Sequence, residues 1–139
     1  MIKRKLGIDL GTKTCGFAIS DPLGIISSAL ENFFFEENQF DLVIQRIKKY
    51  VQEYDIDVFV LGYPTKMTGA KSERTLMVED FHQKLLDNFE QKVVLIDERE
   101  TTKKAEEIMI SAGLSRKKRK KHKDKLAAQL ILDDYLMRL

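Results

Sequence analysis

The stretch of sequence that decides the fold is KRKLGIDLGTKTCGFAIS, residues 3–20. In residues 3–10, apolar side chains alternate with polar or small ones, and this period of two predicts a β-strand with one buried face. The following Gly-Thr-Lys, residues 11–13, is a turn signal, and residues 15–20 predict a second short strand. The stretch therefore predicts two neighbouring strands and places an acidic residue, Asp9, inside the first strand close to the turn.

The rest of the chain adds a third strand and then alternates helices with strands. After a turn signal at residues 21–24, residues 25–30 predict the third strand of an antiparallel meander, and Phe33–Phe35 form its end. Farther along, apolar residues spaced three and four apart predict helices, and short continuous apolar runs predict buried strands. The predicted helices cover residues 39–54, a segment after Lys71 that contains Leu76 to Phe89, residues 102–112 and residues 123–138, and the remaining predicted strands cover residues 58–61 and 93–96.

The predicted element order is therefore βββαβαβαα. Alternating βα units after a meander imply an α/β fold, in which a five-stranded mixed sheet carries helices on both faces. The chain has 139 residues with neither a linker nor an internal repeat, so we expect a single domain over residues 1–139.

Composition excludes several classes of protein. No run approaches the roughly 20 apolar residues that a membrane span requires, and Asp9 cuts short the apolar stretch that follows Lys3–Lys5, so no signal peptide is expected. Cys15 is the single cysteine and cannot form an internal disulfide, which fits a reducing compartment. We therefore expect a cytoplasmic protein without membrane association.

The net charge of +2 hides an uneven distribution of charge. Residues 116–125, the basic tract, read RKKRKKHKDK and hold eight of the 24 Lys and Arg residues against one of the 22 acids. The basic tract thus carries +7, and the rest of the chain carries −5. Such an asymmetry is the first indication of an anionic partner.

Acidic residues lie at three places where a hydrophobic core does not require them. Asp9 lies in the first strand, Asp97 and Glu98 directly follow the strand at residues 93–96, and Asp124 is the only acid in the basic tract. The ends of sheet strands are common positions for active sites, because the loops there leave polar groups accessible around a rigid frame.

Helical spacing places Asp124 more closely. It shares a helix face with Ala127, Ala128, Ile131 and Tyr135, so this face points toward the core rather than toward solvent. The two alanines are small enough to let the helix approach the strands. A carboxylate carried toward the sheet is costly to bury alone, and we therefore expect a cation beside it.

Three carboxylates that converge from two strands and a helix suit hard divalent cations such as Mg²⁺. Two such ions roughly 3.5–4 Å apart would activate a water and stabilise the leaving oxygen in phosphodiester hydrolysis. The two histidines, His82 and His122, are scattered, and no His–Cys set has the spacing of a zinc site.

Each acid also has a purely structural interpretation. An Asp before Gly at a strand end is a common turn former, and an Asp at a helix start is a common cap, as Asp9 and Asp124 would be. Of Asp97 and Glu98, one is expected to start the following helix. The combination of the three positions with an adjoining basic tract favours the catalytic interpretation.

Two other nucleotide-binding patterns match less well. Residues 93–98 are similar to a Walker B strand, but the stretch from Gly62 to Ser72 has two residues too many for the companion phosphate loop. Residues 8–12 resemble the first phosphate loop of actin-like and heat-shock ATPases. Those enzymes clamp a nucleotide between two domains that each carry such a loop, and a chain of 139 residues is long enough for one such domain.

Four motifs in order resemble the YqgF family of Holliday junction resolvase-like proteins over nearly the whole chain. Two residues depart from the family pattern, since Tyr63 and Glu100 stand where leucine is usual. The motifs are Gly7–Lys13 with Gly16, Ala18 and Asp21; Gly62-Tyr63-Pro64 with Met67 and Gly69; Asp97-Glu98-Arg99 with Thr101; and Ser115–Lys121 with Asp124, Lys125, Ala127, Ala128, Ile131, Leu132 and Tyr135.

The resemblance implies a ribonuclease H-like fold and a metal-dependent nuclease. It implies that Asp9, Glu98 and Asp124 form the acidic catalytic site and hold Mg²⁺ (or Mn²⁺). It also implies a role in processing the 5′ end of precursor 16S ribosomal RNA during ribosome biogenesis, with four-way DNA junctions as the rival substrate. A non-catalytic nucleic-acid-binding module is the alternative from another class.

The basic tract is expected to bind the phosphate backbone, because it adjoins Asp124. Its Lys and Arg side chains would neutralise phosphates and release counterions from the nucleic acid. A solvated charge run without a ligand is the structural alternative. The expected partner is structured RNA or branched DNA, bound by a monomer or a homodimer. The predicted nucleic-acid-binding residues are Lys13, Arg99, Arg116, Lys117, Lys118, Arg119, Lys120, Lys121 and Lys123.

Overall fold

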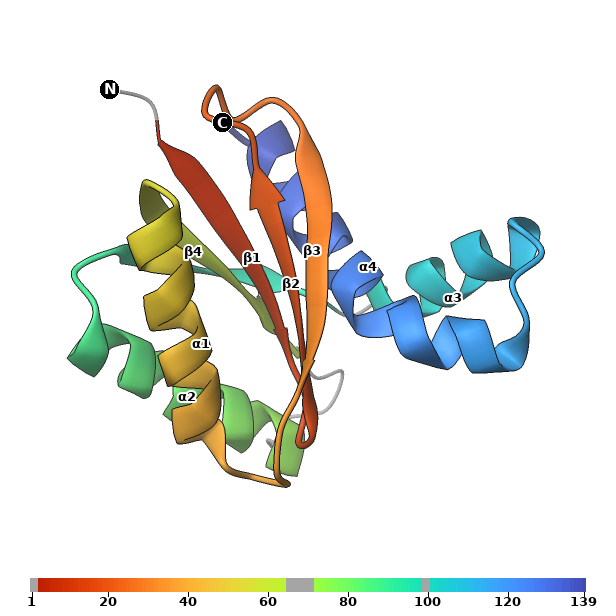
Figure 1. The fold of residues 1–139 in the computed structure, drawn as a ribbon, viewed down its shortest axis with the longest axis horizontal. Helices are drawn as coiled ribbons and strands as arrows, with labels where there is room; N and C mark the ends of the chain where they lie inside the picture. The colour runs from red at the N-terminus through yellow and green to blue at the C-terminus, as the bar shows by residue number, and fades with distance from the viewer. Residues whose placement is uncertain (1–2, 65–71, 99–100) are drawn as a thin grey trace.

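The structure is a computed structural model that describes residues 3–64, 72–98 and 101–139. Its elements follow the predicted order βββαβαβαα (Figure 1). None of the helices in these residues is long and apolar enough to cross a membrane. The strands are β1 (Arg4–Leu10), β2 (Thr14–Ser20), β3 (Ser27–Phe34), β4 (Ile56–Tyr63) and β5 (Lys92–Asp97), and the helices are α1 (Phe40–Glu53), α2 (Glu73–Asn88), α3 (Thr101–Ser111) and α4 (Arg116–Met137).

The five strands form one mixed sheet in the order β3-β2-β1-β4-β5. The first three strands pair in an antiparallel manner, as the predicted meander requires, and β4 and β5 add to the other side of β1 in parallel. The carboxyl ends of β1, β4 and β5 therefore meet at the same edge of the sheet. The predicted α/β class and mixed sheet are confirmed.

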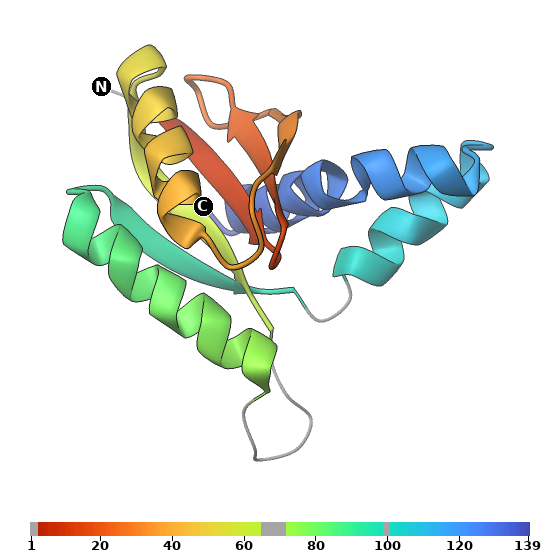
Figure 2. The same ribbon diagram turned by 60° about the horizontal axis from the view of Figure 1, so that its bottom comes forward.

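Helices α1 and α2 cover one face of the sheet (Figures 1 and 2). The larger core lies here, because the alternation in β1 directs its leucines and isoleucine to this face. The fully buried side chains of this core include Leu6, Ile8, Leu10 and Phe17 from the hairpin, Phe59 and Leu61 from β4, and Ile47, Phe81 and Leu85 from the helices.

The opposite face of the sheet is lined with small residues, and α4 packs directly onto it. A Cβ atom on Gly16 would lie 2.0 Å from the carbonyl oxygen of Asp124, and one on Gly7 would lie 2.8 Å from that of Ala128. Ala18 and Ala128 are both fully buried in the smaller core of this face. Glycine is required at these positions because the backbone of the helix occupies the space that a side chain would need.

The sequence prediction was wrong about the start of the last helix. α4 begins at Arg116 instead of residue 123, so the whole basic tract is helical. Lys and Arg are good helix formers, and the side chain of Ser115 caps the helix by accepting a hydrogen bond from the amide of Lys118 at 3.3 Å. Helix α3 packs beside this segment, where Arg119 pairs with Glu106 at 3.0 Å. The hairpin of α3 and α4 extends beyond the sheet (Figure 2).

The third strand also begins later than predicted, at Ser27 instead of residue 25. The carboxylate of Asp21 accepts hydrogen bonds from the amides of Ile25 and Ile26 at 2.7 and 3.0 Å, so both residues belong to the turn. The strand continues to Phe34, which confirms the prediction that the phenylalanine triplet lies at its end.

We expect substitution of the glycines under α4 to destabilise the fold in proportion to the clash. Gly16→Ala should lower the free energy of unfolding by about 3 kcal/mol, because the helix backbone must move, and Gly7→Ala should lower it by less. Urea unfolding of the two variants and the wild type measures this order. A Gly16→Ala protein as stable as the wild type would show that α4 is not held against β2.

Candidate active site

Two buried carboxylates meet at the carboxyl edge of the parallel strands. Asp9 is the last residue but one of β1 and points to the α4 face, and Glu98 directly follows β5. Their exposed fractions are only 5% and 6%. The amide of Glu98 donates a hydrogen bond to the carbonyl oxygen of Tyr63 at 3.1 Å, and its side chain lies against Gly62, where a Cβ would be 2.6 Å from Oε2. The edge of the sheet thus fixes both acids.

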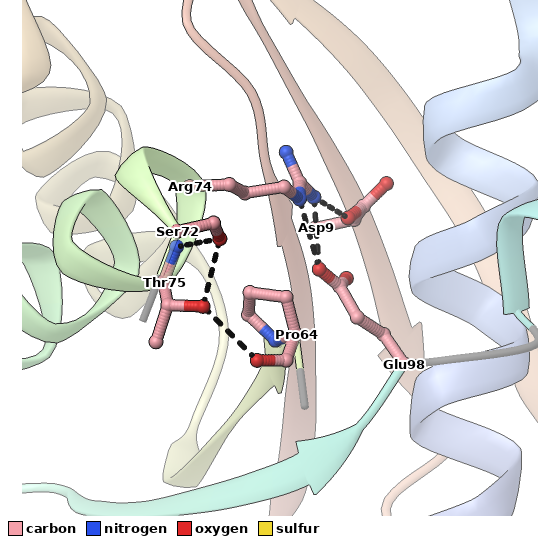
Figure 3. Close-up of polar contacts among 6 residues, drawn as sticks. All are labelled: Asp9, Pro64, Ser72, Arg74, Thr75 and Glu98. Carbon is pink, nitrogen blue, oxygen red and sulfur yellow. Dashed lines mark hydrogen bonds and ion pairs between the residues drawn. The ribbon is translucent and has the colours of Figure 1, made fainter. Parts of the chain in front are cut away.

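Arg74 bridges the two carboxylates (Figure 3). Its Nη2 atom lies 2.9 Å from Oε1 of Glu98 and 3.3 Å from Oδ1 of Asp9, and its Nε atom lies 3.2 Å from the same Glu98 oxygen. The side chain of Arg74 is 42% exposed, so the guanidinium lies between buried acids and solvent. Sequence reasoning missed this residue, because nothing in its local pattern separates it from other helical arginines.

The first turn of α2 holds Arg74 in place. Ser72 is the N-cap, and its side chain accepts a hydrogen bond from the amide of Thr75 at 3.1 Å. The hydroxyl of the buried Thr75 donates in turn to the carbonyl oxygen of Pro64 at 3.3 Å, just after β4. The helix start is therefore tied to the same edge of the sheet as the acids (Figure 3). The capping serine is the one signal that could have located this turn from the sequence.

Asp124 approaches the edge from α4. It lies in the third turn of the helix, so it is not the helix cap that its sequence also allowed. Its Oδ2 atom accepts a hydrogen bond from the hydroxyl of Thr14 at the start of β2. Among the described residues, no group of three Asp, Glu, His or Cys side chains is close enough together to hold one metal ion. The structure therefore brings Asp9 and Glu98 together, with Asp124 beside them on Thr14.

The electrostatics of Asp9 follow from this arrangement. Burial raises the pKa of Asp9 well above its usual value of 3.8, and the charge of Glu98 raises it further. Arg74 opposes the shift, while the charge of Asp124 adds to it. Two buried acids of like charge need a positive partner, and oxygen-only donors of this kind fit a hard divalent cation such as Mg²⁺ or Mn²⁺.

A cleft of about 1010 Å³ opens from Asp124 across the ends of β1, β2 and α2. Lys120 and Lys123 of the basic tract line it, as does Lys13 from the β1–β2 turn, which also lies 3.7 Å from Glu37. Phe34, which is 64% exposed, also lines the cleft. Sequence reasoning treated this phenylalanine only as a strand end, because alternation does not reveal which face remains uncovered.

The other predicted nucleic-acid-binding residues divide into three groups. Arg119 has a structural role, because it pairs with Glu106 and donates to the carbonyl oxygen of Leu114 at 2.9 Å. Arg99 lies outside the described residues. The exposed members of the tract beyond the cleft are Arg116, Lys117, Lys118 and Lys121.

Solved structures of Holliday junction resolvases share the fold of this mixed sheet. The crystal structure of the Fowlpox virus resolvase with Holliday junction DNA matches with a TM-score of 0.64 and 18% identity over 97% of both chains. The RuvC structure from T. thermophilus with a Holliday junction substrate matches with a TM-score of 0.58 and 14% identity, over 98% of this chain and 95% of that one. The predicted ribonuclease H-like fold is confirmed.

The family model described as RuvX, Holliday junction resolvase, matches residues 3–138. The chain belongs to this family, and it is a nuclease that hydrolyses phosphodiester bonds. A relative from Mycoplasmopsis pulmonis named "Putative pre-16S rRNA nuclease" is 49% identical over 97% of this chain and 93% of its own. A relative of the same name from Geobacillus kaustophilus is 44% identical over 96% of both chains.

The raised pKa of Asp9 predicts how metal-free stability depends on pH. The folded state holds the Asp9 proton more tightly than the unfolded chain, so stability falls as the pH rises from about 4 through the raised pKa. Asp9→Asn removes the buried charge and should raise the free energy of unfolding at pH 8 by roughly 0.5–2 kcal/mol. Thermal unfolding in EDTA between pH 4 and 8 measures both effects.

The matched control is Glu90→Gln, since Glu90 is an exposed acid outside the site. This variant should follow the wild type at every pH. An Asp9→Asn protein less stable than the wild type at pH 8 would contradict the electrostatic account of the acid pair.

Proposed function

We propose that this nuclease is a metal-dependent endonuclease that processes the 5′ end of precursor 16S ribosomal RNA in the bacterial cytoplasm. The observation that carries the proposal is the buried pair of Asp9 and Glu98, whose partner Arg74 lines a cleft together with Lys120 and Lys123. The names of the relatives support the RNA substrate.

The catalytic roles proposed for Asp9, Glu98 and Asp124 follow from their positions. Asp9 and Glu98 would hold one divalent ion between them, and Asp124 would contribute an oxygen from the α4 side. The chemistry that such ions supply is activation of a water and stabilisation of the leaving oxygen at a phosphodiester. Burial of Asp9 and Glu98 against the sheet edge holds their oxygens in place.

The basic tract would position the substrate. The tract and Asp124 lie on the same helix, so lysines on its exposed side hold the backbone on either side of the scissile phosphate. Phosphate contacts of this kind fix register without reading bases.

Cleavage of four-way DNA junctions is the second candidate, favoured by the resolvase structures that share the fold. A resolvase must cut two strands, and it would therefore work as a homodimer with two active sites, whereas an RNA-processing enzyme can act as a monomer. A non-catalytic binding module is the third candidate. It would leave the buried acids without a chemical role.

Cleavage assays separate the three candidates. Purified protein is incubated with RNA spanning the 5′ boundary of 16S ribosomal RNA, or with a four-way DNA junction, in Mg²⁺, Mn²⁺ or EDTA. We expect metal-dependent RNA cleavage that falls at least about 100-fold in Asp9→Asn and Glu98→Gln, while RNA binding stays near the wild-type level. Glu90→Gln is the control that should cleave normally.

Cleavage of the junction alone would support a resolvase instead. If binding ignores EDTA and Asp9→Asn behaves as the wild type, the protein is a binding module. Asp124→Asn, which keeps the contact with Thr14 possible, tests the third acid separately.

A second prediction concerns the lysines of the cleft. Lys120→Gln with Lys123→Gln should weaken RNA binding uniformly across sequences and reduce the slope of log affinity against log salt by about 1 per lysine. The matched control is Lys49→Gln with Lys92→Gln, two exposed lysines outside the cleft. Fluorescence anisotropy at several salt concentrations measures the slope, and equal slopes for the two double variants would argue against this binding surface.

A further inference from the structure

The guanidinium of Arg74 occupies the place that a shared cation would take. It reaches Glu98 with two nitrogen atoms and Asp9 with one, so it contacts both members of the acid pair at once. A divalent ion held by Asp9 and Glu98 would compete with the guanidinium for these two carboxylates, because Arg74 already engages one oxygen of each. A divalent ion and the guanidinium on the same acid pair would repel each other at close range, so we expect the bound ion to weaken both Arg74 ion pairs.

The fixed charge of Arg74 also explains why the two acids can be buried together. Arginine stays protonated under all ordinary conditions, so its charge is always available to the pair. The same property means that Arg74 cannot make room for an ion by losing a proton. It can only move, and like-charge repulsion from an ion between the acids would drive that movement.

The surroundings of Arg74 show where it can go. Its backbone is fixed in the first turn of α2 by the Ser72 cap, but its side chain is 42% exposed. The side chain lines the same cleft as Lys120, Lys123 and Asp124. A rotation away from the acids therefore carries the guanidinium into the space where the proposed function places the phosphate backbone.

A guanidinium is suited to that second position. Its planar fork donates two parallel hydrogen bonds to the oxygens of a phosphate, which a single ammonium group cannot do. Lysines of the basic tract would hold the flanking phosphates. Arg74 contacts the acid pair directly, and the scissile phosphate would bind beside this pair.

We propose that Arg74 is a displaceable cation, which neutralises the acid pair in the metal-free protein and binds the scissile phosphate once a divalent ion is held there. The part about the phosphate rests on the proposed function, whereas the displacement does not. A simple structural ion pair makes the opposite prediction, since its removal would loosen the acids and weaken metal binding.

Metal titration without nucleic acid tests the displacement. Calorimetry with Mn²⁺ compares the wild type with Arg74→Gln and Arg74→Lys, and Arg138→Gln is the control because Arg138 pairs with Asp134 at the far end of α4. We expect Arg74→Gln to bind Mn²⁺ about tenfold more tightly, because the competitor is gone, and Arg74→Lys to stay near the wild type. Equal or weaker binding by Arg74→Gln would overturn the proposal.

Cleavage at saturating Mn²⁺ tests the second role. We expect kcat of Arg74→Gln to fall about 100-fold despite its tighter metal binding, and Arg74→Lys to recover only part of the loss, because it restores charge without the fork. Wild-type kcat in Arg74→Gln would overturn this role.

Failure of the proposed function gives a different result. A wild type that binds Mn²⁺ but cleaves neither RNA nor junction refutes the function while the titration still decides the displacement. Thermal unfolding of each variant confirms that the compared proteins are folded.

Discussion

The close contact between α4 and the sheet is the constraint on which the rest of the structure depends. Gly7 and Gly16 leave the sheet without side chains where the helix crosses it, so the helix backbone rests directly on the strands. This contact brings Asp124 to Thr14 at the edge where Asp9 lies. A helix held even one side chain farther away would leave the third acid out of reach of the other two.

The distribution of charge follows from the same geometry. The site acids Asp9 and Glu98 lie at the buried edge of the sheet, and the basic tract forms the N-terminal part of α4. The net charge of +2 is the sum of +7 on the basic tract and −5 on the rest of the chain, to which Asp9 and Glu98 belong. Arg74 reaches the acids from α2 and lines the cleft together with Lys120 and Lys123 of the basic tract.

The sequence predicted the order of strands and helices along the chain, the candidate acids and the basic tract, because these depend on local periodicity and on charge. It could not predict Arg74, since its role arises only when α2 packs beside the carboxyl ends of β1 and β5. It also missed the start of α4, because the first turns depend on the Ser115 cap and on the neighbouring α3, and it did not detect the structural role of Arg119.

One continuous helix carries both the phosphate-binding tract and the acid Asp124. Arg116 and Asp124 are eight residues apart, which corresponds to roughly 12 Å along the axis. Their relative direction is set by helical phase, since each residue adds a rotation of about 100°. Arginine can replace lysine in this segment, but a residue inserted or deleted before Asp124 would rotate the part of the tract N-terminal to it by about 100° relative to Asp124 and the cleft. The length of the tract is therefore more constrained than its composition.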